Sequence, residues 1–152
     1  MKGFLGLDPG ISGGIALISQ LTGAVTTVTT WKMPETDRDI LDVLKPIDPT
    51  RTFAVVERVS TSPQMGVVSA GTFMGNYRAL QMALTALEIP FDLVTPRKWQ
   101  QAMSCLSGGD KNVTKRRAQQ LFPGHKITHA NADALLIAEF CRRIRKDGYG
   151  QK

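Results

Sequence analysis

The fold of this chain is set by the stretch Gly6-Leu7-Asp8-Pro9-Gly10-Ile11-Ser12-Gly13-Gly14-Ile15-Ala16-Leu17. Two apolar runs flank a turn rich in glycine and proline, which predicts a β-hairpin with Asp8 close to the turn. Glycine permits backbone conformations with positive φ and lets a phosphate or a metal ion approach the main chain. Taken alone, the stretch is equally compatible with an ordinary hairpin that carries one solvated aspartate, so the choice depends on the rest of the chain.

Length and composition indicate a single domain spanning residues 1–152. Hydrophobic residues make up 42% of the chain, which is ordinary for a globular protein and argues against disorder. No window has the uninterrupted apolar length of a membrane span, and the first residues lack the pattern of a signal peptide. Because the chain has only two cysteines, Cys105 and Cys141, neither a disulfide framework nor a zinc site is expected. We therefore expect a cytoplasmic protein with reduced thiols and no membrane partner.

The net charge of +6 is unevenly distributed along the chain. Residues 1–96 carry a net charge of −2, and residues 97–152 carry a net charge of +8. A basic half of this size suits a polyanion, of which nucleic acid is the commonest. A solvated surface with a basic tail is the alternative. The sequence has no zinc-finger spacing, RNA-recognition aromatic signature or heptads, so charge alone names no binding mode.

Hydrophobic patterning predicts an alternation of short strands and helices. Strands are expected at residues 3–8, 14–20, 24–31, 53–57 and 91–94. Helices are expected at residues 36–45 with Thr36 as the N-cap, at about 69–88, from Thr95-Pro96 onward, at 111–122 and at about 130–146. Consecutive hairpins followed by alternating helices and strands predict a mixed α/β layer fold.

Small residues recur every four positions in the predicted helix 69–88, at Gly71, Gly75 and Ala79. They form a smooth stripe where another helix can approach closely. Packing within the monomer is the simpler explanation of this stripe, and a dimer contact is the alternative.

Three acidic residues stand at the ends of predicted core elements. Asp8 closes the first strand, Glu57 closes the apolar strand 53–57, and Asp133 lies in the first turns of the last helix. Strand 53–57 has the composition of a strand buried on both faces. Carboxylates in such places are costly unless they are paired or bound to a cation, and Mg²⁺ favours carboxylates, water and substrate phosphate as ligands. Two such ions about 4 Å apart can activate water and stabilise the leaving oxygen in phosphodiester cleavage.

The last helix offers one further candidate for this metal site. Asp133 precedes Ile137 by four residues and Cys141 by eight, so it shares the face of the helix that packs on the sheet. His129 lies one helical turn before Asp133 and is a candidate fourth ligand or proton carrier. A role as a helix cap or a surface residue is the alternative for this histidine.

An ordered set of motifs resembles the RuvC family of Holliday junction resolvases. The set comprises Gly6-Leu7-Asp8-Pro9-Gly10 before a second strand, Val55-Val56-Glu57 at a strand end, and Ala132-Asp133-Ala134-Leu135 opening the last helix. The likeness extends to the helix with Gly71 and Gly75 and to the glycine-rich loop that leads into a basic helix between Gly108 and Arg117. It covers nearly the whole chain in the right order, and the compact length is similar to that of the phage-borne branch of the family.

The resemblance implies an RNase H-like fold, in which a five-stranded mixed β-sheet is flanked by α-helices. It also implies a homodimer that nicks four-way DNA junctions symmetrically with Mg²⁺, acting in DNA recombination and repair in a bacterium or a phage-infected cell. By this likeness Asp8, Glu57 and Asp133 are metal ligands, with two Mg²⁺ ions expected and Mn²⁺ as a substitute. The family usually carries an acid or a histidine three residues before the last aspartate, where this chain has Ala130. Either His129 replaces that ligand through a small shift of the helix start, or one metal is held more weakly.

Two groups of residues are predicted to contact DNA. Phosphate binding is expected from Lys98, Lys111, Lys115, Arg116 and Arg117. A loop predicted at residues 58–68 directly follows Glu57, and its Pro63, Gln64 and Met65 are candidates for a wedge into an opened junction. An ordinary flexible loop is the alternative.

Two other functions are compatible with parts of the sequence. The Asp-x-Gly hairpin also opens actin-like ATPases and sugar kinases, where it holds nucleotide phosphates. Those proteins need two such domains. Their nucleotide binding also does not explain why Asp133 lies on the face of the last helix that packs on the sheet. A non-catalytic protein of the same fold that binds branched DNA or RNA is the second alternative, and Ala130 favours it. A metal-dependent cleavage assay on branched DNA separates all three.

Overall fold

A computed structural model of the chain describes residues 2–21, 26–58, 60 and 64–146. Its centre is a five-stranded mixed sheet with the strand order β3-β2-β1-β4-β5. The strands are β1 (Lys2–Asp8), β2 (Gly14–Gln20), β3 (Thr26–Lys32), β4 (Thr52–Glu57) and β5 (Phe91–Val94). The first three strands form the predicted consecutive antiparallel hairpins, whereas β4 pairs in parallel with β1 and β5 in parallel with β4. The predicted fold class is confirmed.

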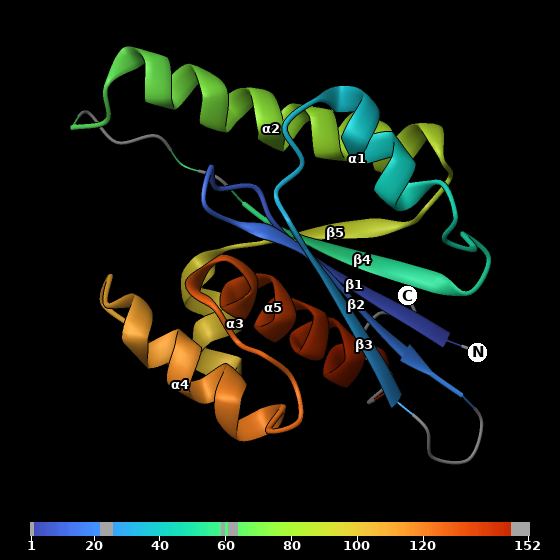
Figure 1. Cartoon of the computed structure of the whole chain (residues 1–152), viewed down its shortest axis with the longest axis vertical. Helices are drawn as coiled ribbons and strands as arrows, with labels where there is room; N and C mark the ends of the chain where they lie inside the picture. The colour runs from blue at the N-terminus through green and yellow to red at the C-terminus, as the bar shows by residue number, and fades with distance from the viewer. Residues whose placement is uncertain (1, 22–25, 59, 61–63, 147–152) are drawn as a thin grey trace.

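In the described part of the chain, five helices cover the two faces of this sheet, and Figure 1 shows their arrangement. They are α1 (Asp37–Leu44), α2 (Val67–Ala86), α3 (Pro96–Ala102), α4 (Lys111–Leu121) and α5 (His129–Lys146). Helices α1 and α2 lie on one face, and α3, α4 and α5 lie on the other (Figure 1). Within the described residues, none of these helices is both long enough and apolar enough to cross a membrane.

Alternation along the strands explains this three-layer arrangement. Phe4 and Val55 point to the face covered by α5, whereas their neighbours Leu5 and Ala54 point to the face covered by α1 and α2. Successive strand residues point to opposite faces, so a strand that is apolar at every position is buried on both sides. The sequence of β4 indicated this burial, and the structure shows Ala54, Val55 and Val56 with no exposed surface.

Local signals in the sequence set the starts of α1 and α3. Helix α1 begins with a capping box in which Thr36 Oγ1 accepts a hydrogen bond from Asp39 N–H, and Thr36 N–H donates to the Asp39 carboxylate. Pro96 occupies the first turn of α3, as predicted. Helix α2 begins at Val67, two residues before its predicted start, so the predicted loop 58–68 is shorter than expected. The first two residues of the predicted strand 24–31 lie outside the described residues.

Helix α5 crosses β1 at very close range. A Cβ atom on Gly6 would overlap the carbonyl oxygen of Ala134 and the backbone nitrogen of Ala138. Glycine in the strand and alanine in the helix therefore allow the two backbones to approach. Because Asp133 directly precedes Ala134, this contact also fixes the height at which Asp133 stands over the sheet.

Candidate active site

Asp8 and Glu57 are brought together by the pairing of two parallel strands. Leu7 of β1 is in register with Val56 of β4, and each strand ends with the acidic residue that follows. Carboxyl ends of parallel neighbours lie at the same edge of a sheet, so these two side chains share that edge. The sequence-based placement of both residues at strand ends is confirmed.

Asp133 lies in the first turns of α5, and its charge acts on both Asp8 and Glu57. Its side chain is partly buried, and its Oδ1 atom is fully buried without a hydrogen-bond partner among the described residues. A buried acceptor without a partner costs free energy, because it has lost water and gained nothing in return. Asp133 therefore has one oxygen available for a ligand that the protein itself does not supply.

The three carboxylates influence one another electrostatically. Burial raises the pKa of Glu57 to about 8, and the negative charges of Asp8 and Asp133 add to this increase. Burial also raises the pKa of Asp8 to about 6, although the Gly10 N–H lowers it, and Asp133 contributes to the rise. The pKa of Asp133 is raised by burial as well, against the opposing effects of the Thr114 hydroxyl, Lys111 and His129. The charge of Asp133 thus contributes to the raised pKa of both Asp8 and Glu57, and we call these three residues the acidic cluster.

The glycine-rich turn shapes the Asp8 side of the cluster. Gly10 N–H donates a hydrogen bond to Asp8 Oδ1 at 3.1 Å, and Gly13 N–H closes the turn by donating to the Gly10 carbonyl at 2.8 Å. A Cβ atom on Gly13 would meet the Asp8 carbonyl and lie 2.7 Å from Asp8 Oδ2. Glycine is therefore needed at this position, because the backbone passes directly beside the carboxylate.

A tryptophan that the sequence analysis did not select contacts the cluster directly. Trp99 Nε1 donates a hydrogen bond of 2.6 Å to Glu57 Oε2. This contact lowers the pKa of Glu57, although the effects of burial and of Asp8 are larger. The one sequence signal was a single large aromatic residue in the otherwise polar helix Pro96–Ala102. That signal indicated a contact with the core, but it did not indicate which acidic residue would accept a hydrogen bond from the indole N–H.

Lys111 is the predicted DNA-binding residue that the structure places at the acidic cluster. Its Nζ donates a hydrogen bond of 3.2 Å to Ser12 Oγ in the turn after Asp8. It also lowers the pKa of both Asp8 and Asp133, which means that its positive charge faces the two carboxylates. Lys111 is the first residue of α4, so the amino end of this helix is joined to the site.

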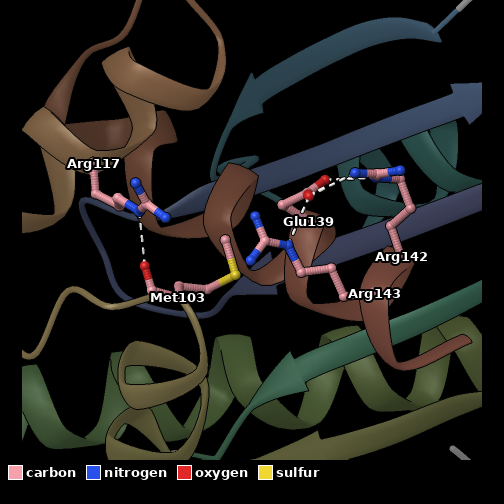
Figure 2. A network of polar contacts seen from close by, with 5 residues as sticks. All are labelled: Met103, Arg117, Glu139, Arg142 and Arg143. Carbon is pink, nitrogen blue, oxygen red and sulfur yellow. Dashed lines mark hydrogen bonds and ion pairs between the residues drawn. The ribbon is translucent and has the colours of Figure 1, made fainter. Parts of the chain in front are cut away.

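The other predicted phosphate-binding residues differ in how free their side chains are. Lys98 on α3 and Arg116 on α4 are exposed, and Lys115 is partly buried. Arg117 is also partly buried, and its Nε donates to the Met103 carbonyl at 2.8 Å, as Figure 2 shows. Arg117 therefore has a structural role in fixing α4 against the end of α3, beyond the DNA contact predicted for it.

Part of the positive charge in the second half of the chain is paired internally. Glu139 is buried on α5 and accepts hydrogen bonds from Arg142 at 2.6 and 2.7 Å and from Arg143 at 2.9 Å (Figure 2). Burial raises the pKa of Glu139, but these two arginines outweigh it, so the net shift is downward. Arg142 and Arg143 are therefore held by Glu139 and are less free than the other basic residues of this half to contact a polyanion.

His129 is exposed at the first position of α5. It lies close enough to Asp133 to lower the pKa of that carboxyl. Ala130 cannot bind a metal through its side chain, and its carbonyl oxygen would lie 2.8 Å from a Cβ atom on Gly14. His129 is thus near the cluster, and its role as a ligand stays a prediction.

The predicted wedge residues lie between β4 and α2. Gln64 is exposed and Met65 is partly buried, just before α2 begins, while Pro63 lies outside the described residues. Their role at a junction stays a prediction.

The residue types of the acidic cluster suit a divalent cation, whereas the positions of their side chains do not yet form a complete metal site. Three carboxylates, one of them with an unpartnered buried oxygen, are the ligand type that Mg²⁺ and Mn²⁺ favour. In the described part of the chain, however, no three His, Cys, Asp or Glu side chains come together as a ready-made metal-binding group. Convergence of Asp8, Glu57 and Asp133 on a shared ion is therefore still a prediction.

Comparisons with known proteins identify the fold. No family model and no curated protein matches this sequence. Among solved structures, the chain is similar to "T. thermophilus RuvC in complex with Holliday junction substrate", with a TM-score of 0.69, 18% sequence identity and coverage of 98% of both chains. It is also similar to "Thermus thermophilus RuvC structure", with a TM-score of 0.60, 19% identity, and coverage of 95% of this chain and 96% of that one. The resemblance to RuvC that the motifs predicted is confirmed at the level of the fold.

Proposed function

We propose that this chain is a metal-dependent endonuclease that cuts branched DNA, with the four-way junction as its principal substrate. The observation that carries the proposal is the acidic cluster of Asp8, Glu57 and Asp133 at the carboxyl edge of β1 and β4, with Lys111 facing it. Buried acids that repel one another are retained in proteins chiefly where a cation or a reaction needs them. The structural likeness to RuvC over nearly the full length of both chains agrees with this assignment.

Each residue of the site has a distinct role in the proposal. Asp8, Glu57 and Asp133 hold the cations, and His129 completes the set from the start of α5. When bound, Mg²⁺ or Mn²⁺ lowers the pKa of a coordinated water and stabilises negative charge on the phosphate oxygens. Lys111 attracts the scissile phosphate to the cluster and offsets the repulsion between the phosphate and the carboxylates.

The surface next to the cluster suits the DNA backbone. Lys98, Lys115 and Arg116 lie on α3 and α4, the helices that flank the cluster through Trp99 and Lys111. Contacts from lysine and arginine to phosphates position a duplex without reading its sequence. We infer that these residues hold the arms of the junction and that binding weakens steeply as salt rises.

The proposal includes a homodimer formed through α2. Three apolar side chains of this helix are largely exposed, with Val67 89%, Val68 82% and Met82 66% exposed. Met82 also lines a groove beside α1, whose lining combines small and apolar residues such as Gly75 and Ala79 with polar ones such as Asn76 and Arg78. Exposed apolar patches of this kind mark interaction sites, and a two-fold dimer would present two acidic clusters to the paired strands of a junction.

The test is a cleavage assay on a four-way junction with a linear duplex of the same sequence as the control. Cleavage is expected with Mg²⁺ or Mn²⁺ and not with EDTA. Asp8→Asn should abolish cutting and leave junction binding intact, because it removes a ligand charge and leaves the basic surface unchanged. Metal-independent binding without any cleavage would overturn the proposal. That result would favour the non-catalytic binding protein, which the missing acid at Ala130 and the absence of a ready-made metal group among the described residues support.

A further inference from the structure

Trp99 has no exposed surface, and its one polar atom is directed at the acidic cluster. Nε1 lies 2.6 Å from Glu57 Oε2, and the two residues are 42 positions apart in the chain. Among the described residues, Trp99 is the one hydrogen-bond donor to this carboxylate. Hydrogen bonds to an ionised carboxylate are shorter and stronger than bonds to a neutral group, so Trp99 would hold Glu57 most firmly in the ionised form that a cation requires.

The indole ring is held in place from several sides. Within α3, Trp99 N–H donates to the Thr95 carbonyl, and the Trp99 carbonyl accepts from Met103 N–H. The side chain belongs to the core cluster that includes Val55 of β4 and Val94 of β5. Close packing leaves the indole ring little freedom, so its N–H points in one fixed direction. The Glu57 carboxylate therefore has to adopt the orientation that accepts this hydrogen bond.

This arrangement suits a specific task. An indole N–H can only donate, so it neither competes for a cation nor accepts a proton from water. By occupying Oε2, it fixes the orientation of the carboxylate and leaves Oε1 without a donor among the described residues. Metal-binding carboxylates in proteins are commonly held by a hydrogen bond from outside the ligand set in this way.

We propose that Trp99 is a positioning residue of the metal site, which fixes Glu57 so that one of its oxygens is oriented for a divalent cation. The inference rests on the proposed function in that it takes Glu57 to be a ligand. A merely structural tryptophan, whose N–H happens to find an acceptor, would stabilise the core and leave metal affinity unchanged. The two roles therefore differ in a measurable quantity.

The first experiment measures Mg²⁺ affinity by calorimetry in the full-length protein. Trp99→Phe keeps an aromatic ring in the core and removes the N–H, and Trp31→Phe on β3 is the matched control at the only other tryptophan. Affinity should fall about tenfold or more in Trp99→Phe, as is typical when the hydrogen bond behind a ligand is lost, and stay unchanged in Trp31→Phe. In a Glu57→Gln background the effect of Trp99→Phe should disappear, because the residue acts through Glu57.

A second measurement leaves Trp99 in place, so it does not depend on the folding of Trp99→Phe. In Trp31→Phe the only tryptophan is Trp99, whose emission should change saturably as Mg²⁺ is added, with the same midpoint as the calorimetric titration. The change should be absent when Glu57→Gln is added to that variant. Mg²⁺ binding that leaves both the emission and the Trp99→Phe affinity unaltered would overturn the inference.

These readouts separate the inference from the proposed function. Weakened Mg²⁺ binding in Trp99→Phe, in a protein that never cuts DNA, would support the positioning role and overturn the nuclease. Normal cleavage and unchanged Mg²⁺ affinity in Trp99→Phe would overturn the positioning role and support the nuclease. A wild-type protein that binds no Mg²⁺ by either method would overturn both.

Discussion

Lys111 Nζ donates a hydrogen bond of 3.2 Å to Ser12 Oγ, although the two residues are 99 positions apart in the chain. The contact joins the first residue of α4 to the turn that follows Asp8. It brings a positive charge to a cluster whose own residues are all acidic, and this charge lowers the pKa of Asp8 and Asp133. Lys111 therefore belongs to the site as well as to the basic surface around it.

We expect Lys111→Met to reduce cleavage by roughly tenfold to a thousandfold, which is the usual cost of removing one donor of transition-state stabilisation. Junction binding should weaken much less, because Lys98, Lys115 and Arg116 remain. Lys111→Arg keeps the charge and should retain part of the rate. The measurement is single-turnover cleavage, with Lys45→Met as the control, since Lys45 is exposed next to α1 on the opposite face of the sheet. An unchanged rate in Lys111→Met would exclude Lys111 from the reaction.

The raised pKa values of the acidic cluster predict how the stability of the metal-free protein depends on pH. Glu57, with a pKa of about 8, and Asp8, with a pKa of about 6, hold their protons more tightly in the folded chain than in the unfolded one. The folded state then binds more protons, so the free energy of unfolding falls as pH rises through these values. We expect the melting temperature without metal to decrease from about pH 5 to about pH 9.

Glu57→Gln isolates the contribution of one carboxyl to this decrease. It should raise the melting temperature near pH 9, where wild-type Glu57 is charged, and it keeps an oxygen that can accept from Trp99. Mg²⁺ should stabilise the wild type more at high than at low pH, because the cation competes with protons for the same oxygens. Glu35→Gln, at an exposed position, is the control in calorimetric melts. If the melting temperature depends on pH in the same way in Glu57→Gln and in wild type, the carboxyl of Glu57 is not a source of that dependence.

The strand and helix positions were largely predictable because local rules decide them. Thr36 begins α1 through its cap, Pro96 begins α3, and the apolar run before Glu57 forms a strand buried on both faces. Asp8 and Glu57 were found for the same reason, since a strand end is a local property and parallel pairing then places both at one edge. The comparison with RuvC structures confirms the fold that these elements build.

Contacts between helices were not predictable in the same way. The bond from Trp99 to Glu57 depends on how α3 packs below the sheet, and the bond from Lys111 to Ser12 depends on where α4 begins relative to the first turn. The periodicity of a single helix encodes neither the angle at which α3 packs on the sheet nor the position at which α4 begins relative to the first turn. Arg117 shows the same limit, because a basic residue in a basic helix gave no sign that the Met103 carbonyl would accept its Nε–H.

The exposed apolar side chains of α2 predict that the protein forms a dimer. Met82 is 66% exposed beside the groove next to α1, so a charge at this position should oppose burial in a dimer. We expect a dimer of wild type and a monomer of Met82→Glu in light scattering at micromolar concentration. Leu21→Glu is the matched control, because Leu21 is 46% exposed at the end of β2 and should leave the dimer intact. A monomeric wild type, unaltered by junction DNA, would rule out the proposed interface.

The last prediction concerns His129, which directly precedes the position at which this sequence differs from the pattern that it otherwise resembles. Residues three and four positions before Asp133 lie on the same side of α5, and of these Ala130 has no side-chain donor for a metal. His129 is exposed at the helix start but close enough to lower the pKa of Asp133. It is therefore the side chain best placed to complete the ligand set or to carry a proton.

Two substitutions distinguish these roles. If His129 is a ligand, His129→Ala should reduce cleavage at least a hundredfold, in line with the loss of a metal-site residue, and His129→Asp should restore much of the rate with Mg²⁺. If it carries a proton, His129→Asp should restore little of the rate. Binding of Mg²⁺ measured by calorimetry falls in the first case and is unchanged in the second. Near-normal cleavage by His129→Ala would exclude both roles and leave a site of three carboxylates completed by water.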